Sequence, residues 1–275
     1  MPTCCVISNP CLNGGSCTSP LPNSRKRFRC LCRIGFYGNC CETANNPRSC
    51  ADFLTEKVKP LSGEYEIVDA TGRSYSVYCD FDSEPGFAWT LLLSFSRDDS
   101  FSISANGLLE DLPINDDTYN WENYRLSAAR MKTIREQSSH WRATCEYPVF
   151  GVDHKDYIRV NLSDVDFSAY YFNEHNGPTG CKTIEYMNIL ESECHQCNFA
   201  LYQGLRGLPG LFLSWSSDWS YCTFDLSNKN YNCPDNKPAG LFISATCFDP
   251  RFRCHKTASS TTQNWFGSTS SLLHR

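Results

Sequence analysis

The sequence lacks the long apolar run that a membrane-spanning helix requires. No stretch of roughly 18 apolar residues occurs in it. The bulkiest apolar run, Leu91–Leu93, is far too short to cross a bilayer. We therefore expect no membrane span.

The sequence also lacks the short motifs that carry catalysis in many enzymes. It contains no Gly-x-Ser-x-Gly elbow, no phosphate-binding loop and no His-Glu-x-x-His pair. Its internal histidines stand apart, without a nucleophile or carboxylate at catalytic spacing: His140, His154, His175, His195 and His255. We predict that the protein is not an enzyme, has no catalytic residue and uses no cofactor.

Positive charge is scarce outside one short segment. The net charge is −5, but residues 1–44 carry five basic residues against one acidic residue, a net charge of +4. The remainder holds 20 basic and 29 acidic residues, a net charge of −9, which is unsuited to binding nucleic acid. The basic cluster Ser24–Arg29 is either a contact for a sulfated glycan or an acidic partner, or an ordinary solvated hairpin.

Cysteine, in contrast, is abundant. The sequence contains 18 cysteines, an even number, and many stand in close pairs. A reducing cytosol would leave that many thiols free, so the number favours an oxidising environment and a secreted protein. The first residues, Met1–Cys5, lack the apolar run of a signal peptide, and we expect such a segment to have lain upstream or to have been removed.

The first cysteine-rich segment, residues 4–42, has too few apolar residues to form a core without cross-links. Asn9–Cys17 reads Asn-Pro-Cys-Leu-Asn-Gly-Gly-Ser-Cys, and Cys30–Cys41 contains Cys-Leu-Cys followed by Gly-Phe-Tyr-Gly. These two patterns resemble an epidermal growth factor (EGF)-like module. Residues 43–49 then form a short polar linker that Pro47 stiffens.

The EGF-like family pairs its cysteines first with third, second with fourth and fifth with sixth. Carried onto this chain, the resemblance implies the disulfides Cys5–Cys17, Cys11–Cys30 and Cys32–Cys41. Cys4 and Cys40 are then surplus, and a bridge Cys4–Cys40 is the simplest arrangement; Cys4 in place of Cys5, or pairing between molecules, stays open. Calcium-binding members carry acidic residues before the first cysteine, and Met1–Thr3 supplies none, so we expect no calcium in this module.

The stretch from Cys50 to Ser96 begins a second domain. Its alternation of apolar and polar residues predicts a short strand over residues 65–70, a turn over 69–73 and a half-buried strand over 75–79. Residues 89–95 are almost wholly apolar and predict a strand that is buried on both faces. A disulfide Cys50–Cys79 would close this unit and stabilise it by roughly 3–4 kcal/mol.

This stretch also resembles the start of a fibrinogen-like domain. The matching residues are Cys50, Ser-Gly-x-Tyr at 62–65, Val-Tyr-Cys-Asp at 77–80 and Trp-Thr at 89–90. The resemblance implies an α+β fold with a mainly antiparallel sheet over residues 50–275. Trp215–Cys222 departs from the family, because it lacks the second aspartate and the Gly-Gly-Trp-Trp string. We therefore transfer neither the calcium site nor the acetyl-sugar pocket of that family.

The rest of the second domain shows one clear helix and several strands. Apolar residues at helical spacing predict a helix over residues 126–137, capped by Ser127. Alternating or apolar runs predict strands at residues 141–145, 157–160, 167–172, 211–215 and 240–245. Serine-rich residues 259–262 and 268–271 predict loop and tail, with an aromatic pair between them that pins the end to the core.

Two polar features suggest a modification or an ion. The sequon Asn161-Leu162-Ser163 predicts a glycan on Asn161, or a sequon that is not used. The acidic stretch 110–122 offers hard oxygen ligands and could hold calcium weakly, but its spacing fits no known calcium loop. A solvated acidic face is the commoner explanation, so we predict no metal site.

Eight cysteines follow Cys79, which allows on the order of a hundred pairings. We predict Cys222–Cys233, because these residues flank a turn-rich loop. The other pairings stay open: Cys145, Cys181, Cys194, Cys197, Cys247 and Cys254. Cys194-His195-Gln196-Cys197 could be a redox motif or a zinc ligand pair, but it lacks a thioredoxin-like context and a second ligand pair, so ordinary disulfide cysteines are favoured.

These observations favour a secreted, noncatalytic extracellular matrix or adhesion protein whose partners are matrix proteins or glycans. Segments 139–145 and 260–267 are similar to cnidarian (coral) skeletal organic matrix proteins, in which an EGF-like module precedes a divergent fibrinogen-like domain. That similarity implies a component of a mineralised matrix. Contact with mineral does not follow from it, but the acidic second domain could contact calcium or mineral weakly. The alternative is a secreted lectin-like glycan-recognition protein, with an aromatic cleft built from Trp215, Trp219 and Tyr221.

Overall fold

The computed structural model divides the chain into two compact units, Met1–Pro47 and Arg48–Arg275. The described residues are 9–18, 28–32, 36–37, 40–41, 43–44, 46–54, 60–100, 108, 110–165, 172–173, 177–178, 181–199, 201–203, 211–213, 222, 242 and 248–269. Among these residues, no helix is long and apolar enough to cross a membrane.

The described residues of the first unit include two short antiparallel strand pairs. β1 (Ser16–Thr18) pairs with β2 (Arg29–Leu31), and β3 (Phe36–Tyr37) pairs with β4 (Thr43–Ala44). Strands of two or three residues bury too little apolar surface to hold a fold by themselves.

Disulfides take the place of a core in this unit. Cys11–Cys30 and Cys32–Cys41 are both formed, and these are pairs that the family resemblance implies. Cys41 is fully buried, and a Cβ atom added at Gly15 would lie 2.7 Å from its sulfur, so the close approach requires glycine. The unit is therefore a cross-linked module, as its low apolar content predicts.

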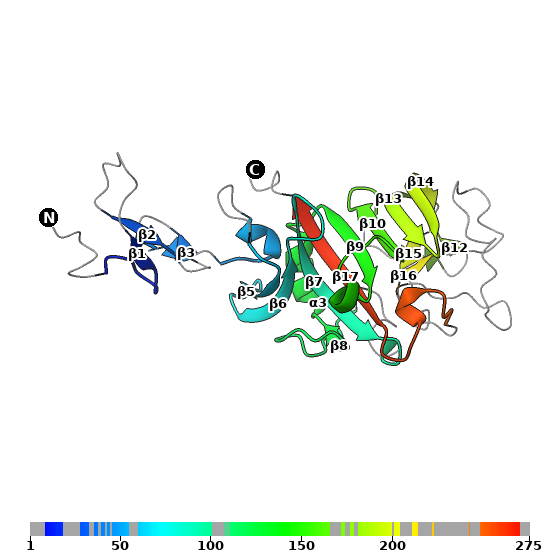
Figure 1. The fold of residues 1–275 in the computed structure, drawn as a ribbon, viewed down its shortest axis with the longest axis horizontal. Coiled ribbons are helices and arrows are strands. Elements are labelled where there is room, and N and C mark those ends of the chain that lie inside the picture. Colours follow the sequence, from blue (N-terminus) through cyan, green and yellow to red (C-terminus); the bar gives the residue numbers. More distant parts are fainter. Residues whose placement is uncertain are drawn as a thin grey trace. The chain divides into compact units, whose positions relative to one another are not determined.

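The second unit is organised around one nine-stranded sheet (Figure 1). Its spatial order is β14–β13–β10–β9–β17–β7–β6–β5, and β8 pairs with β7 outside this path. In chain order the strands are β5 (Gly63–Val68), β6 (Ser74–Asp80), β7 (Phe87–Ser96), β8 (Asn123–Arg125), β9 (His140–Cys145), β10 (Tyr157–Asn161), β13 (Lys182–Ile189), β14 (Ser192–Phe199) and β17 (Thr261–Thr269). Every pairing in the sheet is antiparallel, so the prediction of a mainly antiparallel sheet with few helices is confirmed.

Two further strand pairs lie outside this sheet. β11 (Phe172–Asn173) pairs with β12 (Gly177–Pro178), and β15 (Leu201–Gln203) pairs with β16 (Leu211–Leu213). The predicted strands at residues 167–172 and 240–245 lie almost entirely outside the described residues.

The strand at the centre of the sheet, β17, is one that the sequence pattern misses. It pairs with β7 on one side and β9 on the other, and Thr261–Ser268 are all buried. The prediction of loop and tail is therefore wrong for residues 261–262 and 268–269, which belong to this strand, whereas Trp265 and Phe266 are buried in the core. Gln263, a buried polar side chain of this strand, finds partners on both neighbouring strands: it donates to the Ser94 hydroxyl at 3.2 Å and accepts from the Thr144 hydroxyl at 3.2 Å.

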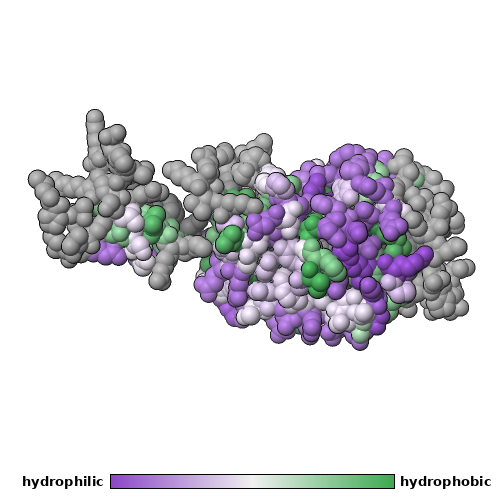
Figure 2. Space-filling model, viewed as in Figure 1, coloured by the Kyte–Doolittle hydropathy of each residue, from purple (hydrophilic) through white to green (hydrophobic). Residues whose placement is uncertain are grey.

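Aromatic side chains fill the core on either side of β17. Trp89, Trp141 and Trp265 are each almost completely buried. Gly267 makes room for Trp89, because a Cβ atom at this position would overlap the indole ring. The visible face of the second unit, in contrast, is mostly hydrophilic or intermediate, with a hydrophobic area near its middle (Figure 2).

The hairpin β5–β6 and its disulfide agree with the sequence pattern. A carboxylate oxygen of Asp69 accepts hydrogen bonds from the backbone amides of Thr71 and Arg73, at 2.8 and 3.1 Å, and so closes the turn. The disulfide Cys50–Cys79 joins η1 (Cys50–Phe53) to β6 and is the pair that we predicted.

The helix is shorter than predicted and is capped by a different residue. α3 spans Ala128–Arg135 and buries Met131 and Ile134. Ser127 makes no side-chain capping bond, so its predicted role is wrong. The Asp111 carboxylate instead accepts from the backbone amide of Ala128 at 2.9 Å.

The remaining disulfides include one correction. Cys222 is bonded to Cys181, with 5.6 Å between their Cα atoms, so the predicted bridge Cys222–Cys233 is wrong. That prediction depended on closeness along the chain, whereas the fold brings Cys222 to the start of β13. The structure also contains Cys145–Cys254 and Cys194–Cys197.

Several predicted bridges involve cysteines outside the described residues. Cys17 is disulfide-bonded, but Cys5, its predicted partner, lies outside them, as does Cys4 of the predicted bridge Cys4–Cys40. Cys233 and Cys247 lie outside them as well.

Candidate functional site

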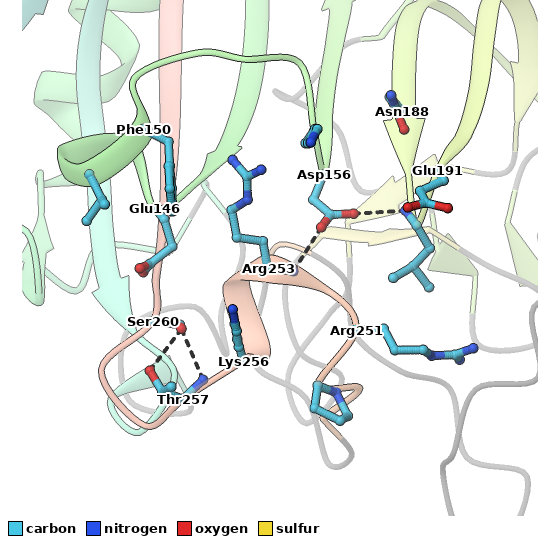
Figure 3. Close-up of a pocket in the computed structure, with 14 residues that line it drawn as sticks. Glu146, Phe150, Asp156, Asn188, Glu191, Arg251, Arg253, Lys256, Thr257 and Ser260 are labelled. Carbon is cyan, nitrogen blue, oxygen red and sulfur yellow. Dashed lines mark hydrogen bonds between the residues drawn. The ribbon is translucent and has the colours of Figure 1, made fainter.

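A cavity of about 630 Å³ lies beside the C-terminal end of β9. Its walls come from α4 (Tyr147–Phe150), the loop before β10, the turn between β13 and β14, and the segment around η4 (Arg253–His255) (Figure 3). This volume lies within the range of sites for small ligands, roughly 300–1,000 Å³. We call this cavity the α4 pocket.

A sharp change of backbone direction forms one wall of the α4 pocket. Glu146 follows β9 in the left-handed region, with φ at 57°, and leads the chain directly into α4. Its carboxylate accepts from the backbone amide of Thr261, which fixes this turn to β17. Gly151 ends α4 at a φ of 62°, a conformation that favours glycine.

Asp156 ties two other walls of the pocket together. Its two carboxylate oxygens accept from the backbone amides of Leu190, at 2.8 Å, and Arg253, at 2.9 Å (Figure 3). Burial raises the pKa of Asp156, although both of these hydrogen bonds oppose that shift. The side chain is therefore a structural tie between the β13–β14 turn and the η4 segment.

The positive charges of the pocket are of two kinds. Arg253 forms two hydrogen bonds with the Asp153 carboxylate, at 2.8 and 2.9 Å, and Arg251 pairs with Asp249 at 2.6 Å. Lys155 and Lys256 line the pocket and form no ion pair with a described residue. The arginines are neutralised by their own partners, which leaves the two ammonium groups as donors for a ligand.

An aromatic ring stands at the rim of the same pocket. Phe150 is 54% exposed, and the Arg253 guanidinium lies over its ring at 4.6 Å from the centroid. Val149 beside it is 67% exposed. The pocket thus combines an apolar rim with hydrogen-bond donors and acceptors, an arrangement that suits the binding of a polar ligand with an apolar face.

A second polar cluster is buried beneath the sheet surface. The Arg142 guanidinium contacts Asp80 at 2.5 Å and Glu84 at 2.7 Å, and Arg142 and Asp80 are both completely buried. Arg142 also lies over the indole rings of Trp89 and Trp265, at 4.4 and 4.8 Å from the centroids. Burial raises the pKa of Asp80, but the charge and hydrogen bonds of Arg142 outweigh it and hold the pKa below its ordinary value.

This buried cluster continues toward the surface through alternating charges. Arg159 contacts Glu84 and, at 2.8 Å, Glu185, and the Tyr157 hydroxyl donates to Glu84 at 2.9 Å. The hydrogen bond from His140, together with Arg159, lowers the pKa of Glu185 to about 2 against the opposing effect of burial. Each acidic side chain in this series of contacts forms an ion pair with a basic side chain, which is typical of a structural network.

The predicted glycan site lies at the end of β10. Asn161 is half-buried, and its side-chain oxygen accepts from the backbone amide of Ser163 at 2.9 Å. Ser163 is exposed. The sequon therefore sits in a turn at the edge of regular structure.

The acidic stretch 110–122 is used within the fold. Asp116 and Asp117 contact the Arg130 guanidinium at 3.0 and 2.9 Å, and Asp111 caps α3. Among the described residues, no three His, Cys, Asp or Glu side chains come together in a way that could hold a metal ion.

The residues that line the α4 pocket were not predicted from the sequence. They stand in segments far apart in the chain, and the Asp153–Arg253 pair joins residues 100 positions apart. The only local signal was the exposed apolar pair after Pro148. The aromatic cleft predicted from Trp215, Trp219 and Tyr221, and residues 24–27 of the basic cluster, lie outside the described residues.

Comparison with known families identifies the first unit. Residues 5–39 match the EGF-like domain. A search of curated proteins finds no match to the chain. The EGF-like domain and the many disulfides together suggest an extracellular protein.

Proposed function

We propose that the protein is a secreted, noncatalytic extracellular matrix or adhesion protein, with matrix proteins or glycans as its partners. The observation that carries the proposal is an EGF-like module in a chain that is disulfide-bonded in both units. Such cross-links persist in oxidising, extracellular environments. The pairing of Arg142 with Asp80 and Glu84, and of Glu84 with Arg159, supports a noncatalytic role for this network, because each of these charges is shared with one of opposite sign.

The proposal includes a divergent fibrinogen-like domain over residues 50–275, after a linker at 43–49. The Cys50–Cys79 bridge and the hairpin that it holds support this identity, since they occupy the positions that carry the resemblance. The boundary between the two compact units also falls within the linker.

A component of a mineralised skeletal organic matrix is the narrower form of the proposal. Segments 139–145 and 260–267, which carry that similarity, form most of β9 and β17, two paired strands at the centre of the sheet. The residues of buried central strands are constrained by how their side chains pack in the core. The similarity therefore supports a shared fold more than it supports contact with mineral.

Localisation and thiol content test the main proposal together. Immunogold labelling of the source tissue should place the protein outside cells, and labelling of the denatured, unreduced protein should find essentially no free thiols among its 18 cysteines. Retention of the intact chain on decellularised matrix should follow. A cytosolic signal, or stoichiometric free thiols, would contradict an extracellular role.

A lectin-like glycan-recognition protein is the second candidate, and the α4 pocket favours it. The pocket offers two lysines without ion-pair partners among the described residues, and an exposed aromatic ring onto which a sugar can pack. A glycan array with the intact protein should give a selective hit that Phe150→Ala removes. Leu61→Ala is the matched control, because Leu61 is also exposed, at 77%, and does not line the pocket. If no glycan on the array is bound, the matrix function alone is favoured.

Asn161 is proposed to carry a glycan in the secreted protein. The turn that follows Asn161 and the exposure of Ser163 support access by the glycosylating enzyme. A mass shift on deglycosylation that is absent from Asn161→Gln would establish the modification, and an unmodified Asn161 peptide from native tissue would refute it.

A further inference from the structure

The disulfide Cys194–Cys197 differs from the other disulfides between described cysteines. It closes the shortest loop, with a sequence separation of 3, whereas the others span separations from 9 to 109. A bridge restricts the unfolded chain less as the loop becomes shorter. Cys194–Cys197 is thus the bridge whose loss changes the stability of the whole domain least.

The bridge also distorts the strand that carries it. Residues three apart in an extended strand have Cα atoms roughly 10 Å apart, but those of Cys194 and Cys197 are 6.0 Å apart. Gln196 absorbs the contraction in the left-handed region, with φ at 48°. Ile184 pairs with Cys197 and Tyr186 pairs with His195, and the pairing between these two is interrupted at Gln196.

The position of the bridge makes it accessible. β14 ends the sheet order and pairs only with β13 among the described strands. The side chain of His195, between the two cysteines, is 69% exposed. Cys194 is 7% exposed, whereas Cys197 is half-buried, so an incoming thiolate reaches the sulfur of Cys197 more easily.

We propose that Cys194–Cys197 is a reducible disulfide that opens in the folded protein by exchange with an external dithiol. One thiolate of the dithiol attacks the Cys197 sulfur, the Cys194–Cys197 bond breaks, and the Cys194 thiolate leaves and takes up a proton. The second thiol of the dithiol, as its thiolate, then attacks the mixed disulfide. It displaces the Cys197 thiolate, which is protonated in turn, and leaves the dithiol oxidised. The protein gains two electrons and two protons, and the dithiol loses both.

Opening the bridge changes a cavity as well as a strand. Gln196 and His195 line a cavity of about 530 Å³ together with Glu185 and Arg159, which belong to the buried charge network. Once released, Gln196 returns to an extended conformation and restores the interrupted pairing with β13. The redox state of the bridge therefore sets the shape of this cavity wall.

Graded reduction of the intact, folded protein tests the proposal. The protein is treated with increasing dithiothreitol, trapped with iodoacetamide and mapped by mass spectrometry. Cys194 and Cys197 should be alkylated about ten times faster than the fully buried pair Cys50–Cys79, without a change in tryptophan fluorescence. Hydrogen exchange of the Gln196 segment should slow after reduction, because the pairing is restored. Earlier reduction of another bridge, or reduction only together with unfolding, would overturn the proposal.

A single substitution separates the effect of backbone strain from that of simple exposure. Gln196→Gly removes the steric cost of the left-handed conformation and disfavours the extended one, so it should shift the equilibrium toward the disulfide by about tenfold. His195→Gly, at an exposed neighbour that pairs normally with Tyr186, is the matched control and should leave the equilibrium closer to that of the wild type. Equal shifts in both variants would refute the role assigned to Gln196.

Discussion

The buried guanidinium of Arg142 offers the sharpest test of how the second unit is held together. Replacing Arg142 by methionine keeps most of the side-chain volume but removes the charge that neutralises Asp80, a carboxylate with no exposed surface. Glu84 keeps Arg159 and Tyr157 as partners, so the cost falls mainly on Asp80. Leaving one charge of a buried pair uncompensated costs about 3–5 kcal/mol, and we expect about 4 kcal/mol here.

Urea unfolding with the disulfides intact, followed by tryptophan fluorescence, measures this free energy. Arg73→Ala is the matched control, because Arg73 and its partner Asp117 are exposed by 66% and 53%, and such surface pairs contribute about 0–1 kcal/mol. Adding Asp80→Leu to Arg142→Met should recover part of the loss, since the orphaned charge disappears. A cost below about 1 kcal/mol for Arg142→Met would refute the argument that this network stabilises the domain.

Four further outcomes are expected. Burial, with a smaller contribution from Arg97, lowers the pKa of His255 to about 4. As the pH falls, the unfolded state therefore takes up the proton first, and the free energy of unfolding should fall by up to about 3 kcal/mol between pH 6.5 and 4. His255→Gln should flatten this pH dependence, measured by urea unfolding at each pH. Gly267→Ala should lower the melting temperature by several degrees, because the added Cβ overlaps the ring of Trp89; an unchanged melting temperature would contradict the packing described. Removing Cys145–Cys254, which spans a separation of 109, should cost about 4–5 kcal/mol in the chain-entropy account, measured by urea unfolding of the double serine variant. Millimolar calcium should leave the melting temperature nearly unchanged at matched ionic strength, and a rise of several degrees with calcium but not magnesium would show a site that the acidic residues form together.

The sequence predicts best those elements whose buried residues form a local pattern of apolar side chains. The apolar run over residues 89–95 predicts β7 because both faces of that strand pack against other side chains. Residues 75–79 alternate and predict β6 for the same kind of reason. The EGF-like cysteine pattern works similarly, since the cross-links of a small module are its core.

Local patterns do not predict elements whose burial depends on contacts with residues far away in the chain. The ends of β17 read as loop and tail because the burial of this strand depends on distant partners: Gln263 exchanges hydrogen bonds with Ser94, Thr144 and Tyr147, all more than a hundred positions earlier. β14 contains Glu193, His195 and Asn198 on its exposed face, which hides the hairpin that it forms with β13. The α4 pocket is built by tertiary contacts alone, so no window of sequence contains it.

The central place of β17 has a consequence for how the protein is made. β9 ends at Cys145 and β17 begins at Thr261, 116 positions later. At roughly 5–20 residues per second, a ribosome needs roughly 6–23 s to cover that distance. During this delay β7 and β9 each have one edge without a partner strand, the side on which β17 later pairs, and such edges are where nascent chains aggregate. The two halves of the sheet therefore stay separate until the last strand of the chain is made.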